Sequence, residues 1–111
     1  MTPERKVKAA ITKVLKDMKG KGVPLWWCTP IGSPFGGSGV PDLLICLQGR
    51  FIAVEVKAPG RLRETTALQR EQISAIWAAR GEAWVIDDIS QFIEALRVYV
   101  GRIPERVRPK L

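Results

Sequence analysis

The chain has 111 residues, of which 46% are hydrophobic and 26% are charged, and its formal net charge is +7. These values predict one globular domain with a single modest core and exclude a disordered chain. The sequence contains no histidine, which excludes Ser-His and Cys-His triads and histidine-bound zinc. It also lacks an apolar run long enough to span a bilayer and the apolar core of a signal peptide, so we expect a cytoplasmic protein.

The first predicted element is an amphipathic helix over residues 3–19. Apolar side chains recur at helical spacing along it, and Gly20 and Gly22 end the run. A short strand follows at Leu25–Cys28. Residues 30–39 then form a glycine-rich segment without the Gly-Lys-Ser/Thr ending of a phosphate-binding loop, so nucleotide binding is not expected. The segment is either a loop that closes over a substrate or a long connection, and Phe35 near its centre either wedges against a base or packs.

The centre of the chain predicts a β-hairpin. Leu43–Leu47 is an apolar run, Gln48-Gly49-Arg50 is a turn signal, and residues 51–57 are rich in β-branched and aromatic side chains. Residues 66–80 then predict a helix that Gly81 ends, and residues 83–86 predict a fourth strand. Asp88 or Ser90 caps a last helix that reaches about residue 100.

The predicted order of elements is α-β-β-β-α-β-α, an α/β fold with a mixed four-stranded sheet flanked by helices. We expect one domain over residues 1–100 and a basic tail over residues 101–111, without an internal repeat or a domain linker. Cys28 and Cys46 lack zinc-like spacing and indicate small buried residues in a reducing compartment. For the four tryptophans, Trp26, Trp27, Trp77 and Trp84, packing in the core is the default expectation.

Two acidic residues and a lysine form the most informative pattern. Side chains alternate along a strand, so Glu55 and Lys57 point the same way, and Asp42 at the mouth of the partner strand can face Glu55. Two carboxylates held close repel each other, and a hard cation such as Mg²⁺ relieves the repulsion. A metal ion beside an ammonium group is a suitable centre for phosphodiester hydrolysis. The alternative is a solvated strand face after an ordinary Pro-Asp turn.

The segments Gly39-Val40-Pro41-Asp42-Leu43 and 51–57, followed by Gln69 and Gly81, resemble the virus-type replication-repair nuclease (VRR-NUC) domain of the PD-(D/E)XK nuclease superfamily. The resemblance covers roughly residues 4–87. It implies that Asp42, Glu55 and the Val56 carbonyl bind Mg²⁺ or Mn²⁺ and that Lys57 is the catalytic lysine.

The resemblance also implies supporting roles for Gln69 on the second helix and Glu4 on the first. Both residues have structural alternatives. In Thr66-Ala67-Leu68-Gln69 the glutamine fits a capping box that only satisfies a backbone donor, and Glu4 follows Thr2-Pro3 at the positive end of a helix dipole.

The positive charge predicts a polyanionic partner, because Lys and Arg side chains neutralise phosphates. Basic residues lie on both sides of the acidic pattern, and the alternative for each is a solvated helix face. The candidates for nucleic-acid binding are Lys6, Lys13, Lys16, Arg61, Arg63 and Arg70.

Three functions therefore compete. The favoured one is a metal-dependent DNA endonuclease. The second is a nucleic-acid-binding module of the same fold without catalysis, and the third is an interaction protein whose basic tail docks on an acidic partner. By resemblance, small stand-alone relatives imply a homodimer that cuts branched DNA in the manner of a Holliday-junction resolvase, in a bacterial or phage-infected host cell.

Overall fold

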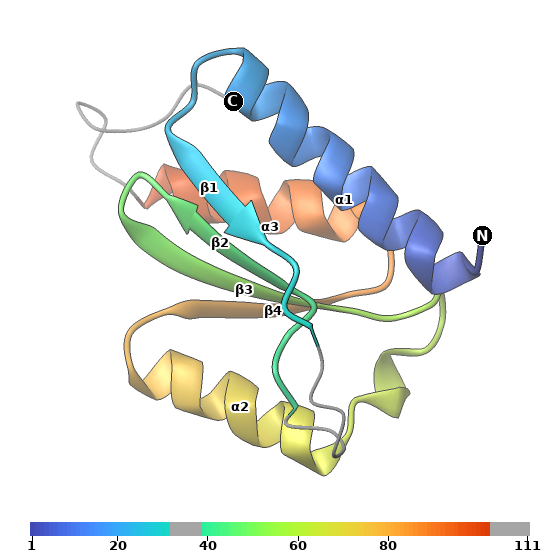
Figure 1. Ribbon diagram of the computed structural model, residues 1–111. Coiled ribbons are helices and arrows are strands. Elements are labelled where there is room, and N and C mark those ends of the chain that lie inside the picture. Colours follow the sequence, from blue (N-terminus) through green and yellow to red (C-terminus); the bar gives the residue numbers. More distant parts are fainter. Residues whose placement is uncertain (32–38, 103–111) are drawn as a thin grey trace.

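The computed structural model describes residues 1–31 and 39–102 (Figure 1). The order of helices and strands is the predicted α-β-β-β-α-β-α, with one additional 3₁₀ helix. The helices are α1 (Pro3–Gly20), η1 (Leu62–Glu64), α2 (Ala67–Ala78) and α3 (Ile89–Gly101), and the strands are β1 (Leu25–Cys28), β2 (Leu43–Leu47), β3 (Arg50–Val56) and β4 (Glu82–Ile86). None of the described helices combines the length and apolar character that crossing a bilayer requires.

The four strands form one mixed sheet in the order β1-β2-β3-β4. The first two pairs are antiparallel and the β3–β4 pair is parallel. Gln48 and Gly49 join β2 to β3 with φ angles of 51° and 78°, as a tight hairpin turn requires. The turn sets the register, in which Leu43 lies opposite Val54. Asp42 and Glu55 are therefore the next pair beyond the end of this ladder.

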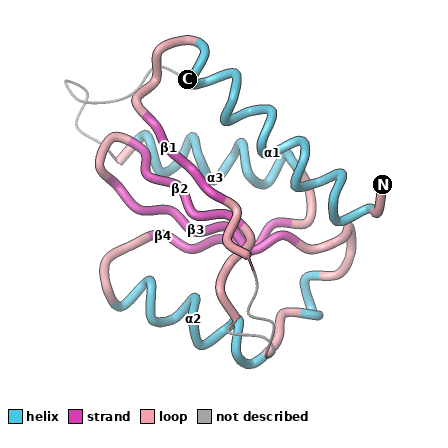
Figure 2. The backbone as a smooth tube through the Cα atoms, in the orientation of Figure 1, coloured by secondary structure: helices cyan, strands magenta, loops and turns pink. Residues whose placement is uncertain are grey.

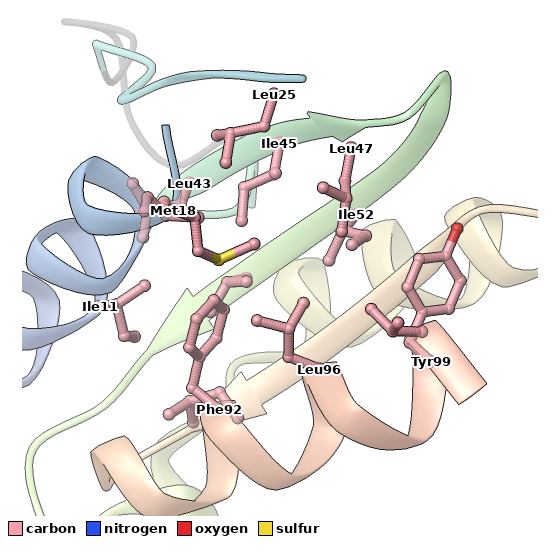
Figure 3. Packing of buried hydrophobic residues seen from close by; sticks show 14 of the residues in the cluster. Ile11, Met18, Leu25, Leu43, Ile45, Leu47, Ile52, Phe92, Leu96 and Tyr99 are labelled. Atoms are coloured by element: carbon pink, nitrogen blue, oxygen red, sulfur yellow. The ribbon is translucent and has the colours of Figure 1, made fainter. Parts of the chain in front are cut away.

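The core lies between the sheet and the helices α1 and α3. Alternate residues of β2 and β3 point into it, and Figure 3 shows Ile45 and Ile52 on the side of the sheet that faces Phe92 and Leu96 of α3. Helix α1 contributes Ile11, which is fully buried. Helix α2 lies on the opposite side of the strands, where it contacts β4 (Figure 2). The sheet thus has an apolar face and a second face that carries the acidic pair.

The second face of the sheet corrects two expectations. Trp26, Cys46 and Phe51 are neighbours in the strand register and are exposed there, and Trp77 of α2 is also exposed. Core packing was therefore the wrong expectation for Trp26 and Trp77. Burial was wrong for Cys46, and Cys28 is only partly buried. The physical reason is alternation: the residues before and after Cys46 point into the core, so its own side chain points outward.

The helix boundaries follow from their caps. Thr66 caps α2 through a capping box with Gln69, and Asp88 rather than Ser90 caps α3, where its side chain accepts from the Ser90 backbone N–H. Helix α2 ends two residues earlier than predicted, because Arg80 adopts a left-handed conformation with φ 71°.

Candidate catalytic centre

Asp42 and Glu55 meet where the β2–β3 ladder ends. The backbone N–H of Val56 donates to Asp42 Oδ2 at 2.8 Å, which fixes the aspartate beside the strand that carries Glu55. Glu55 points to the face opposite the core residues Val54 and Val56, yet only 3% of its surface is exposed. The predicted pairing of these two carboxylates is what the strand register and this hydrogen bond produce.

The environment of Glu55 favours its protonated form. Burial is the largest cause, and a hydrogen bond with Asp42 and the negative charge of Asp42 act in the same direction. The positive charge of Lys57 opposes them, whereas the negative charge of Glu4 adds to them. Together they raise the pKa of Glu55 to about 9. The two carboxylates therefore share a site that does not hold two negative charges unless a cation compensates.

One oxygen of Glu55 has no partner. Among side-chain polar atoms in the described part of the chain, Glu55 Oε2 is the one that is buried without a hydrogen bond. Such an atom costs free energy, on the order of 1–3 kcal/mol, unless a ligand or solvent satisfies it. A carboxylate oxygen that has no hydrogen-bond partner and lies next to a second carboxylate is therefore available as a ligand for a hard cation.

Lys57 and Gln69 form the other half of the centre. Lys57 is the first residue after β3, and only 9% of its surface is exposed. Its Nζ donates to Gln69 Oε1 at 2.8 Å. The same Gln69 oxygen accepts a second hydrogen bond, from the Thr66 backbone N–H at 2.9 Å. In return, the backbone N–H of Gln69 donates to Thr66 Oγ1. The capping and the site contact of Gln69 thus coexist, and the capping box orients the amide that holds the lysine.

A glycine brings Asp42 and Gln69 to the same place. Gly39, three residues before Asp42, has φ +70°, and a Cβ added there would lie 2.6 Å from the carbonyl oxygen of Leu68. Leu68 precedes Gln69 in the first turn of α2. Only glycine permits this approach of the two backbones, so the segment that leads to Asp42 rests against the start of α2.

A buried carboxylate near the centre was not identified from sequence. Asp87, directly after β4, accepts the Gly60 N–H at 2.9 Å and the Gln91 side-chain amide at 2.6 Å, and its own N–H donates to Gln91 Oε1. These contacts tie the segment after Lys57 to the start of α3. The Asp-Asp pair that follows the apolar fourth strand was the available signal, but only Asp88 entered the prediction, as a helix cap.

The predicted residues of α1 lie at different positions around the helix. Glu4 is exposed and close enough to Glu55 to act on its pKa. Lys6 borders a shallow hollow with Pro59 and Asp88, whereas Lys13 and Lys16 border another one on α1 itself. The structure therefore places Glu4 near the acidic pair, whereas the three lysines border two different hollows.

The predicted arginines lie around η1 and the start of α2. Arg61 is exposed and pairs with Glu64 at 2.9 Å. Arg63 and Arg70 line a shallow hollow with Val85 of β4, the residue opposite Glu55 in the register. The role expected for the glycine-rich loop and Phe35 concerns residues 32–38, and most of the basic tail is residues 103–111, so both lie outside the described residues.

The donor set suits a cation that keeps part of its water shell. Within residues 1–31 and 39–102 there is no group of three or more His, Cys, Asp or Glu side chains arranged around a metal site. The two carboxylates alone match Mg²⁺, which proteins often hold by one or two carboxylates together with waters and substrate phosphates. The expected ligand role of the Val56 carbonyl stays a prediction. Comparisons with models of known families, with curated proteins and with solved structures found no match for this chain.

Proposed function

We propose that this chain is a metal-dependent endodeoxyribonuclease that hydrolyses phosphodiester bonds. The observation that carries the proposal is the buried, unpartnered Glu55 Oε2 beside Asp42, with the buried Lys57 held by Gln69. A buried glutamate beside a second carboxylate and a fixed ammonium group is unfavourable for stability alone, which supports a catalytic use.

Each residue has a part in this proposal. Asp42 and Glu55 hold Mg²⁺ or Mn²⁺, which when bound lowers the pKa of coordinated water and polarises a phosphoryl oxygen. Lys57 offsets the negative charge that grows on the phosphate in the transition state, and Gln69 keeps its Nζ in place. Arg63 and Arg70 lie on the β4 side of the centre, where they can contact the DNA backbone.

The finer features of the proposal rest on the sequence resemblance. The order of elements and the positions of Asp42, Glu55, Lys57 and Gln69 are compatible with a VRR-NUC domain of the PD-(D/E)XK superfamily. From that resemblance we propose branched DNA as the preferred substrate and a homodimer as the active form.

A non-catalytic nucleic-acid-binding module is the second candidate. One observation favours it: the described residues offer two carboxylates and no third acidic or sulfur ligand at the centre. In that case Glu55 stays protonated at neutral pH and the Lys57–Gln69 contact serves only packing.

The deciding experiment is a cleavage assay on labelled four-way junction, flap and plain duplex DNA, with Mg²⁺ or Mn²⁺ and an EDTA control. Lys57→Ala and Glu55→Gln test the centre, and Glu94→Gln on the exposed side of α3 is a matched loss of one carboxylate. We expect metal-dependent cutting that both centre variants abolish and Glu94→Gln retains. Binding of DNA by a folded protein without cutting in either metal would select the non-catalytic module.

A further inference from the structure

One flank of α1 presents several cationic side chains and begins near the acidic pair. Glu4, Lys8, Thr12 and Lys16 follow one another at intervals of four residues, which places their side chains in one row on the helix surface. A shallow hollow on this flank is lined by Arg5, Lys8, Ala9, Thr12, Lys13 and Lys16. The first turns of α1 lie close to the candidate centre, because Pro3, Lys6 and Val7 line a hollow together with Pro59, two residues after Lys57.

The far end of the row is fixed on the sheet. Lys19, one turn beyond Lys16, lies with its Nζ 5.6 Å from the ring centroid of Trp27 in β1. Trp27 is partly buried against the core, so it is a rigid support for the lysine. In Figure 1, α1 begins beside the segment that follows β3 and runs along the sheet toward the start of β1. The row therefore extends from the centre along one side of the molecule.

Within the described part of the chain, the cations of the row form no ion pair with an acidic side chain. Across residues 1–31 and 39–102, the ion pairs are Arg61–Glu64 and Arg102–Glu82, and neither involves α1. Helix α1 holds six cationic residues against Glu4 and Asp17. Like charges at neighbouring positions of a helix destabilise it slightly, so an unpaired row is not explained by helix stability. An anionic ligand would neutralise these charges.

We propose that this flank of α1 binds the phosphate backbone of a DNA duplex in line with Asp42 and Glu55; that alignment rests on the proposed nuclease function. Residues 4–19 span about 22 Å along the helix axis, which corresponds to roughly six nucleotide steps of one strand. The row holds no Asn or Gln that could read base edges, so it binds without regard to sequence.

Other polyanions fit the row less well. A membrane surface would need large apolar anchors next to the cations, and the apolar residue in the hollow is Ala9. Single-stranded DNA would need exposed aromatic rings for base stacking, and Trp27, the ring at the row, is partly buried under Lys19.

The test is duplex binding in EDTA, measured by fluorescence anisotropy at several salt concentrations. The double variant Lys8→Gln/Lys16→Gln removes two charges from the row. The control Lys21→Gln/Arg97→Gln removes the same charge from the hollow between α1 and α3. We expect the row variant to weaken duplex binding by about tenfold or more and to reduce the slope of log K against log salt by about 2. The control should change the affinity and the salt slope much less. Thermal unfolding should show that the row variant and the control both fold.

The proposal is overturned if the two double variants lose the same affinity for the duplex. The net charge of the protein would then explain binding without a role for the position of the row. It is also overturned if the row variant loses binding to phosphatidylserine vesicles but keeps its affinity for the duplex. The EDTA condition separates this test from the nuclease proposal, since binding is read without cutting. If the chain does cut in Mg²⁺, the row variant should raise KM and leave kcat unchanged, and a fall in kcat alone would contradict the positioning role.

Discussion

Glu55 is the residue at which stability and the candidate chemistry conflict. Burial first, and then the hydrogen bond and negative charge of Asp42, raise the pKa of this carboxyl to about 9 from an ordinary value of 4.5. Its Oε2 is also buried without a hydrogen-bond partner. In the unfolded chain the same carboxyl ionises near its ordinary value. Folding therefore takes up one proton between these two pH values, which makes the metal-free protein less stable as the pH rises.

Glu55→Gln should remove this pH dependence. In EDTA, the contribution of Glu55 to the free energy of unfolding should be fully present below about pH 4.5 and should be lost toward pH 9 by at most about 1.4 kcal/mol per pH unit. Between these pH values the variant should therefore lose less stability than the wild type. Urea unfolding at several pH values measures both. Mg²⁺ should stabilise the wild type at pH 8 and leave Glu55→Gln unchanged, because binding a cation to the native state alone adds stability. Parallel pH profiles for the two proteins would contradict the assigned cause.

Gln69 has two roles that substitution can separate. Thr66→Ala removes the oxygen that caps α2 but leaves the Lys57 contact of Gln69 in place, so it should cost about 1 kcal/mol of stability with little effect on cutting. Gln69→Leu removes the Lys57 contact and the side-chain oxygen that accepts from the Thr66 N–H, while the backbone N–H of residue 69 still reaches Thr66 Oγ1. We expect a similar loss of stability together with a 10- to 100-fold fall in kcat. Urea unfolding and single-turnover cleavage measure the two effects. If Thr66→Ala and Gln69→Leu cleave at the same rate, the role of Gln69 is limited to capping α2.

At the scale of elements, the centre depends on how one loop meets one helix. Gly39→Ala should destabilise the protein by about 1–3 kcal/mol, because the added Cβ would meet the Leu68 backbone and φ is +70°. Gly49→Ala is the control: its φ is +78° but nothing lies within 4 Å of the added Cβ, so about 1 kcal/mol is expected from the backbone alone. Thermal unfolding compares them, and an equal loss would show that the contact with Leu68 is unimportant. Gly39→Ala should also lower cleavage more, since it shifts Asp42 relative to Gln69.

Helix α2 shows how weakly its own sequence specifies its position. None of its residues is buried, and Trp77, which could be taken for a core residue, instead lies exposed while its Nε1–H donates to the Ala83 carbonyl at 3.1 Å. The helix is fixed by its cap, by its contacts with β4 and by the glycine approach at its first turn. These are long-range features, which a helical pattern in the sequence does not contain.

At the scale of the whole molecule, the homodimer expected from the resemblance is a prediction of its own. A chain of 12.4 kDa presents little surface to a branched DNA, and two copies would supply two centres. We expect light scattering at micromolar concentration to give a mass near that of two chains. A mass of one chain, both with and without four-way junction DNA, would contradict the predicted homodimer. Any cleavage would then be the activity of a monomer.

The sequence by itself determined the order of elements, the bounds of β1 and β2, and the pairing of Asp42 with Glu55. These follow from local signals: the two-residue turn at Gln48 and Gly49 fixes the hairpin register, and strand alternation then fixes the faces. Gly20, Thr66 and Asp88 likewise marked helix ends through local backbone chemistry.

Only the tertiary structure decided which features of distant segments meet. It showed that Gln69 holds Lys57 while capping α2, that Asp87 ties Gly60 to α3, and that Trp26 and Cys46 lie on the exposed face of the sheet. It also selected, among the many lysines of α1, the flank that begins near Glu55. The physical reason is that burial and side-chain contacts depend on packing between elements. The sequence pattern within one helix or strand indicates which of its faces is apolar, but it does not specify which other elements pack against that face.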